Sequence, residues 1–374
     1  MNNTILGQII NEGTQLTNLI LQIQSLEGLI NANPENLELQ MQRNVLQQQL
    51  AALQVATDQK RRILISEIER LTGRRLITYF SIYGSISDRD SRIIEDFLFS
   101  NSISKFDILI DSPGGFTDAA EKMIKICRMR TGSDDNFDFR TIVVNQAKSA
   151  ATLFALGSSK ILLSKTAELG PVDPQIVVFA PNGERILDSA HQIFYGSQKF
   201  LDNSKGILNF RKDGDLILLS KYDPIAIKRA EVAISHTSDI IRKRIYTNPN
   251  LKVGYKDENS IKEDLRIFTD HAASHSHGRP IYYEDIKDSQ ICKNKFIQKL
   301  SEYFSTEQNL SVDIVEKIEH LLWELTIRSL EVVRVNNEPI LDKDGNQIGT
   351  NQIARKLFES SSGLILTTEN TNQS

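Results

Sequence analysis

Two turns, each joining an apolar run to a helical pattern, constrain the fold of this chain more than any other feature. Residues 106–111 (Phe-Asp-Ile-Leu-Ile-Asp) predict a short buried strand, which Pro113-Gly114-Gly115 ends before helical spacing begins at Thr117. Residues 141–144 (Thr-Ile-Val-Val) predict a second strand, because β-branched residues favour strands. Ser149 follows this strand, where the next helix begins. The pattern strand, turn, helix therefore occurs twice within about fifty residues.

The same alternation extends over residues 76–163. The predicted strands cover residues 76–83, 106–111, 140–144 and 160–163, and the predicted helices cover 88–100, 117–130 and 149–157. Strands that alternate with helices of this length predict crossover connections and a mostly parallel sheet, hence an α/β fold. In such sheets ligands bind at the carboxyl ends of the strands, and both turns fall there.

The residue types in these turns indicate a chemistry. Adjacent glycines bring bare N–H groups close to a ligand, and a helix N-terminus offers unpaired N–H donors. A glycine amide and a helix-start amide beside a hydroxyl form the layout of an oxyanion hole with its nucleophile. The turns therefore favour Ser149 as a nucleophile. The alternatives are that Ser149 only caps its helix and that the glycines only form a turn.

Length, charge and cysteine content limit the function classes. The 374 residues predict two or three units, which we place at residues 1–73, 74–290 and 291–374. The net charge of −4 argues against a nucleic-acid partner. Two cysteines, without a metal-binding spacing, favour a reducing, cytoplasmic location. We expect no membrane partner, since no signal peptide pattern opens the chain and no window approaches a membrane-spanning apolar length.

The first predicted segment resembles a helical hairpin or coiled coil. Apolar residues from Ile5 to Ile30 keep helical steps, Asn33-Pro34 interrupts them, and a second helix is predicted from Pro34 to about Leu71. One interpretation is an arm for oligomerisation or for binding a partner protein. The other is that these helices pack against their own domain. The length of the second helix favours the arm.

The last segment is predicted to be a helical accessory region. Residues 311–330 predict one helix, and the polar residues 367–374 predict a disordered tail. Residues 342–346 (Asp-Lys-Asp-Gly-Asn) fit a hairpin turn better than a calcium loop. Residues 271–277, which hold three histidines, favour a loop over a metal site. We therefore predict no metal.

Three motifs carry a resemblance to a known family. Residues 111–115 (Asp-Ser-Pro-Gly-Gly) resemble the glycine turn of the Clp protease fold, and residues 147–157 resemble its nucleophile helix. Residues 168–175 (Glu-Leu-Gly-Pro-Val-Asp-Pro-Gln) resemble the serine dehydrogenase proteinase family, which is similar to signal peptide peptidase A. The resemblance covers roughly residues 76–290. It implies a Clp/crotonase-like fold, a homo-oligomer, and a serine peptidase that acts on a peptide or protein substrate without a cofactor.

The resemblance also implies roles for particular residues. Ser149 is the expected nucleophile, with an oxyanion hole formed by the amides of Gly115 and Ala150. The residues expected to contact substrate are Ser112, Gly114 and Thr152.

The general base stays open at this point. Residues 169–174, where Clp proteases place a histidine, contain none. Signal peptide peptidase relatives use a lysine further downstream, in a window that here holds His191 and Lys199. A lysine base needs a pKa lowered toward neutrality. Lys148 adjoins the serine but is expected to point away from it. Asp173 either orients a site group or only makes a turn before Pro174.

Two other functions compete with the peptidase. A crotonase-like enzyme uses the same oxyanion hole on a thioester and needs no serine hydroxyl at position 149. A scaffold or binding protein that kept the fold and lost the chemistry is the other, and the missing base supports it.

Overall fold

The computed structural model describes residues 5–82, 85–100, 103–179, 185–202, 223–269, 278–333, 336–341 and 347–370. The chain divides into two compact units: Met1–Tyr83 together with Phe304–Ser374, and Gly84–Tyr303. This division differs from the three predicted segments, because the two ends of the chain fold together. No helix within the described residues is long and apolar enough to cross a membrane.

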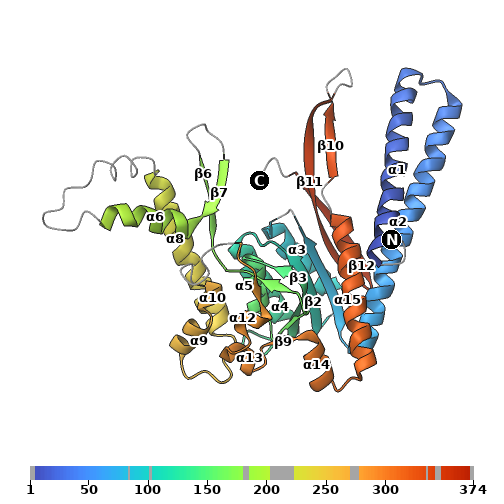
Figure 1. Ribbon diagram of the computed structural model, residues 1–374. Helices are drawn as coiled ribbons and strands as arrows, with labels where there is room; N and C mark the ends of the chain where they lie inside the picture. The colour runs from blue at the N-terminus through green and yellow to red at the C-terminus, as the bar shows by residue number, and fades with distance from the viewer. Residues whose placement is uncertain are drawn as a thin grey trace. The chain divides into compact units, whose positions relative to one another are not determined.

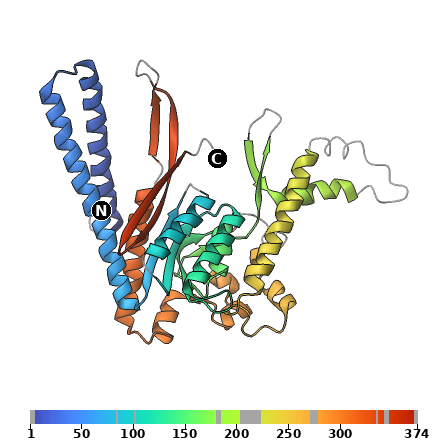
Figure 2. The same cartoon turned by 180° about the vertical axis from the view of Figure 1, so that it is seen from behind.

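The second unit contains the predicted parallel sheet (Figure 1). Its parallel strands, in sheet order, are β2 (Phe106–Ser112), β3 (Phe139–Ala147), β4 (Ile161–Leu163) and β9 (Ile297–Lys299). The helices that alternate with them are α3 (Asp88–Ser100), α4 (Thr117–Thr131) and α5 (Ala150–Leu156). Figure 2 shows α3 and α4 lying over one face of these strands. Every residue of β2 is buried, as expected for a parallel strand with both faces covered. The predicted α/β fold with a mostly parallel sheet is confirmed.

A smaller lobe of the second unit follows β4. Strand β5 (Glu168–Leu169) pairs in parallel with β3 and antiparallel with β8 (Ile281–Tyr282). Strands β6 (Gln175–Phe179) and β7 (Arg185–Ser189) form a hairpin, and α6 (Ala190–Asp202) packs on α8 (Pro224–Ile241) through a small apolar cluster. Short helices complete the lobe and the path to β9: η1 (Arg242–Tyr246), α9 (Glu258–Asp264), α10 (Arg266–Thr269), α12 (Tyr283–Ile286) and α13 (Gln290–Lys293). Helix α14 (Leu300–Thr306) follows β9.

The first unit contains the predicted helical hairpin, formed by α1 (Ile5–Ala32) and α2 (Leu37–Thr72). Helix α2 begins three residues after Pro34, because the Asn36 side chain accepts the Leu39 N–H at 3.2 Å and caps the helix. Both helices contact α15 (Val312–Val333), which matches the helix predicted at residues 311–330. Glu12 of α1 joins the three helices through ion pairs with Lys60 at 2.6 Å and Arg328 at 2.9 Å.

The expectation of a helical C-terminal region was wrong beyond α15. Strands β10 (Asn336–Leu341), β11 (Gln347–Ser360) and β12 (Gly363–Asn370) form antiparallel pairs, and β11 also pairs with β1 (Arg75–Ser81). The polar residues 367–370 thus belong to a strand, while 371–374 lie outside the described residues. The predicted hairpin turn at 342–346 also lies outside them, but β10 and β11 on either side pair antiparallel as such a turn requires.

Candidate active site

Ser149 lies between β3 and α5 with an unusual backbone conformation. Its φ is 51° and its ψ is −119°, and the residue is 6% exposed. A positive φ is uncommon for a residue with a side chain and costs on the order of 1–3 kcal/mol. The Ser149 side chain makes no capping hydrogen bond to α5. The alternative that Ser149 serves as a helix cap therefore finds no support in the structure.

Gly114 brings the two predicted turns together. Its φ is 108°, and a Cβ on it would lie 2.7 Å from the Lys148 carbonyl oxygen and 2.7 Å from the Ser149 Cβ. Only glycine fits such an approach. Ser112 links the turns further, since its carbonyl accepts the Lys148 N–H at 3.0 Å and its Oγ accepts the Gly114 N–H at 3.2 Å. Ser112 is fully buried, so its hydroxyl serves the turn.

In the described part of the chain, two backbone amides at this junction lack an acceptor. Ile86 forms a parallel bridge with Gly115, in which the Ile86 N–H donates to Gly114 and the Phe116 N–H donates to Ile86. The Gly115 amide then points away from Ile86, and a Cβ on Gly115 would lie only 2.1 Å from the Ile86 nitrogen. Within the described residues neither the Gly115 N–H nor the Ala150 N–H, the first of α5, has an acceptor.

Strand β3 contains a bulge shortly before Ser149. Ile110 pairs with Val143, but the next pair along β2 is Ser112 with Ala147, so β3 holds the extra residues. Asp111 lies opposite the bulge and is 1% exposed. Its Oδ2 accepts the Asn145 side-chain amide at 2.9 Å, while its Oδ1 has no hydrogen-bond partner among the described residues.

Burial raises the pKa of Asp111 to about 7. The hydrogen bonds from Asn145 and Gln146 lower this pKa, and the negative charge of Glu168 raises it, but neither outweighs the burial. The sequence indicated Asp111 only as the end of a strand, so its burial and raised pKa were not predicted.

The segment that follows β5 packs against the nucleophile turn. A Cβ on Gly170 would lie 3.0 Å from the Lys148 Cβ, and Lys148 forms an ion pair with Glu168 at 2.7 Å. The Gly170 N–H donates to Thr152 Oγ1 at 3.1 Å, and that hydroxyl donates to the Ala147 carbonyl at 2.6 Å. Thr152, which we expected to contact substrate, is fully buried and holds this segment to α5.

Asp173 and His191 form a close pair in the same lobe. The Asp173 Oδ1 and His191 Nδ1 are 2.5 Å apart, and the two residues are 2% and 9% exposed. The Ala190 N–H donates to the Pro174 carbonyl at 2.8 Å, which fixes the start of α6 beside Asp173. The Tyr195 ring stacks on the His191 ring with centroids 5.8 Å apart. An imidazole that donates from Nδ1 to a carboxylate keeps Nε2 as a proton acceptor.

The path of the chain limits how far Asp173 can lie from the nucleophile turn. Asp173 follows Gly170 by three residues, which span at most about 11 Å, and Gly170 contacts Lys148. Lys199 lies about two helical turns after His191 on α6, and its side chain lies outside the described residues. The three histidines of residues 271–277 also lie outside them. The described part of the chain holds no cluster of three potential metal ligands.

Comparison with known proteins supports the resemblance inferred from the motifs. Residues 30–193 match the family model of the ClpP-like SDH-type serine proteinases. This segment includes the glycine turn, Ser149, Asp173 and His191. The family resemblance predicted from the sequence is confirmed over this part of the chain.

Individual relatives are distant. Two uncharacterized proteins of Methanocaldococcus jannaschii are 31% and 30% identical over 133 and 129 residues, which are 35% and 31% of this chain and 45% and 42% of theirs. The chain thus spans less than half of the length of these relatives. Two solved structures of the 1510-N membrane-bound stomatin-specific protease, one with a substrate peptide, are 20% identical. They cover 34% of this chain and 62% and 59% of their own, with TM-scores of 0.24 and 0.23.

Proposed function

We propose that this chain, whose residues 30–193 match the ClpP-like SDH-type serine proteinases, is a serine peptidase that forms an acyl-enzyme at Ser149. The observation that carries the proposal is the conformation of Ser149. Its φ is 51°, Gly114 packs closely against it, and no backbone N–H at the start of α5 donates to its hydroxyl. A strained serine at a strand-to-helix turn presents its oxygen to a substrate.

His191 is the general base in this proposal, and Asp173 positions it. The Nε2 atom takes the Ser149 proton as the oxygen attacks the peptide carbonyl, and returns the proton to the leaving amine. A water molecule then attacks the acyl-enzyme in the same way: His191 Nε2 takes a proton from the water and returns it to Ser149 as the acyl group leaves. The hydrogen bond between His191 Nδ1 and Asp173 supports this choice over Lys199, because a neutral imidazole can accept a proton directly, whereas a lysine must first lose its own.

The amides of Gly115 and Ala150 bind the oxyanion that develops at the carbonyl oxygen. Each donor of this kind is worth roughly 3–4 kcal/mol of the activation barrier. The support is that neither amide has an acceptor within the described chain, although both stand beside the Ser149 turn. Gly114 lines the substrate side of the turn, Ser112 links the two turns, and Thr152 holds the segment after β5 to α5.

The substrate class is a peptide or protein, and we place the reaction in the cytoplasm. Cys127 and Cys292 are both buried and free, which fits a reducing compartment.

A fluorophosphonate probe tests the nucleophile and the base in one series. We expect wild type to be labelled, Ser149→Ala to be unlabelled, and His191→Ala to be labelled at least a hundredfold more slowly. Ser238→Ala on α8 is the matched control and should be labelled like wild type, because the Ser238 hydroxyl donates to the Ile234 carbonyl of its own helix. If His191→Ala is labelled rapidly and Lys199→Ala is not labelled, Lys199 and not His191 is the general base.

Two results would replace the peptidase. A chain that is not labelled and cleaves no peptide in a library screen would be a scaffold of the same fold. A chain that hydrolyses acyl thioesters equally well with Ser149→Ala would be a crotonase-like enzyme.

A further inference from the structure

Helix α2 carries apolar side chains on two opposite faces. One face packs against α1 in the hairpin. On the other face, five large apolar residues are between 52% and 71% exposed: Leu37, Met41, Val45, Val55 and Ile63. We call these five residues the outer stripe. Met41, Val45 and Val55 of this stripe lie on a series with the heptad spacing of a coiled-coil seam, and Leu37 and Ile63 flank it. The other positions of the series are Gln48, Ala52, Gln59 and Arg62.

Four of the five residues of the outer stripe are symmetric about residue 50. Reversing the helix about that point places Leu37 opposite Ile63 and Val45 opposite Val55. It also places Gln48 opposite Ala52, at the centre of the seam. A two-fold interface requires that residue i contacts j and that j contacts i. The pairs Leu37 with Ile63 and Val45 with Val55 meet this requirement with apolar groups, while Met41 falls opposite Gln59.

The charges along the stripe obey the same symmetry. Glu38 falls opposite Arg62, and both side chains are exposed. Neither has an ion-pair partner among the described residues, since Asp58, one turn before Arg62, is held by Arg61 at 2.6 Å. A parallel pairing would instead oppose Glu38 with Glu38 and Arg62 with Arg62, which is repulsive. The charges therefore favour an antiparallel second copy.

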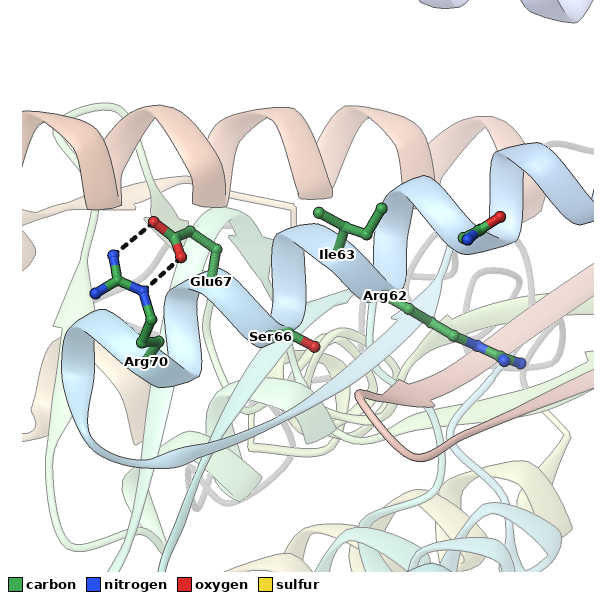
Figure 3. Close-up of a pocket in the computed structure, with 6 residues that line it drawn as sticks. Arg62, Ile63, Ser66, Glu67 and Arg70 are labelled. Carbon is green, nitrogen blue, oxygen red and sulfur yellow. Dashed lines mark hydrogen bonds and ion pairs between the residues drawn. The ribbon is translucent and has the colours of Figure 1, made fainter.

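A hollow at the C-terminal end of the stripe fits the same register. It is lined by Gln59, Arg62, Ile63, Ser66, Glu67 and Arg70. Figure 3 shows Arg62, Ile63 and Ser66 on α2, with the pair of Glu67 and Arg70 at one end. In the antiparallel register, Leu37 and Met41 of the second copy lie at the level of Ile63 and Gln59. The hollow is therefore placed to receive these two side chains.

We propose that α2 is a self-association surface, on which a second copy of this chain packs antiparallel between Leu37 and Ile63. The two-fold axis passes at the level of residue 50. The paired segment is about 39 Å long, from 1.5 Å of rise per residue.

Cysteine cross-linking of the full chain tests the register, because the native Cys127 and Cys292 are buried. Val45→Cys and Val55→Cys are oxidised separately and as a mixture. We expect a disulfide dimer in the mixture only, since the two Val45 positions of an antiparallel pair lie about 15 Å apart, beyond disulfide reach. Val232→Cys on α8, 55% exposed, is the control and should not cross-link with either. A dimer from Val45→Cys alone would indicate parallel pairing, and no dimer in the mixture would overturn the proposal.

Charge reversal tests the specific pairing. Glu38→Arg and Arg62→Glu should each weaken self-association about tenfold, because each change disrupts two symmetry-related pairs. The two changes in one chain should restore it. Concentration-dependent light scattering measures this, and a double variant as weak as the single ones would refute the register.

Discussion

Replacing Asp111 by asparagine should stabilise the protein in a manner that depends on pH. The folded chain holds the Asp111 pKa at about 7, mainly through burial. An unfolded chain has a value near 3.9. Between about pH 4 and pH 7 the unfolded state therefore loses this proton while the folded state keeps it, and the free energy of unfolding falls as pH rises. Three pKa units correspond to about 4 kcal/mol.

Asparagine keeps an oxygen for the Asn145 amide but has no proton to lose. The stability advantage of Asp111→Asn over wild type should therefore be small at pH 4, grow through pH 5 and 6, and level off above pH 7 at up to about 4 kcal/mol. Urea unfolding of both proteins at pH 4, 5.5, 7 and 8.5 measures it.

The matched control is Asp107→Asn on the same strand. Asp107 binds Arg140 at 2.7 Å, so its loss should destabilise the protein by leaving a buried guanidinium without its carboxylate. A constant difference between Asp111→Asn and wild type from pH 4 to pH 8.5 would refute the reasoning.

Three further substitutions have definite expected results. Gly114→Ala should abolish fluorophosphonate labelling and lower the midpoint of urea unfolding, because its Cβ would lie 2.7 Å from the Ser149 Cβ; labelling at the wild-type rate would contradict the geometry. Asp173→Asn should lower kcat by roughly 10³–10⁴ with KM nearly unchanged, because the His191 ring loses its orientation, and a change confined to KM would argue for a substrate contact instead. Arg61→Ala should cost about 3–5 kcal/mol of unfolding free energy, because it leaves the fully buried Glu359 carboxylate without the guanidinium 2.8 Å away; a loss below about 1 kcal/mol would show that water reaches the pair.

The strands β2, β3 and β4 and the helices α3, α4 and α5 were predictable because each of these strands contains a short apolar run. Residues 106–112 and 139–144 are buried on both faces, so the local sequence alone indicates them. The Ser149 turn was also predictable from the local sequence, because a pair of glycines and the start of a helix mark the two turns that meet there.

The C-terminal strands were missed because their residues look solvated. Lys356 and Glu359 are charged, yet both are fully buried in β11. The partner that makes this acceptable for Glu359 is Arg61, 298 residues away in the sequence. No local pattern reports such a contact.

The pairing of Asp173 with His191 was not predictable either, although each residue was a candidate alone. The β6–β7 hairpin brings them together across 18 residues. Similarly, the Asp111 environment depends on a bulge in β3, which periodicity does not indicate.

The central claim is that Ser149 carries the chemistry, and mapping of the probe adduct tests it most directly. Full-length protein is reacted with a fluorophosphonate, digested and examined by mass spectrometry, with His191→Ala and Ser149→Ala in parallel. The account predicts one adduct, on Ser149, which forms rapidly only when His191 is present. An adduct on another serine, or peptide cleavage that persists in Ser149→Ala, would contradict it.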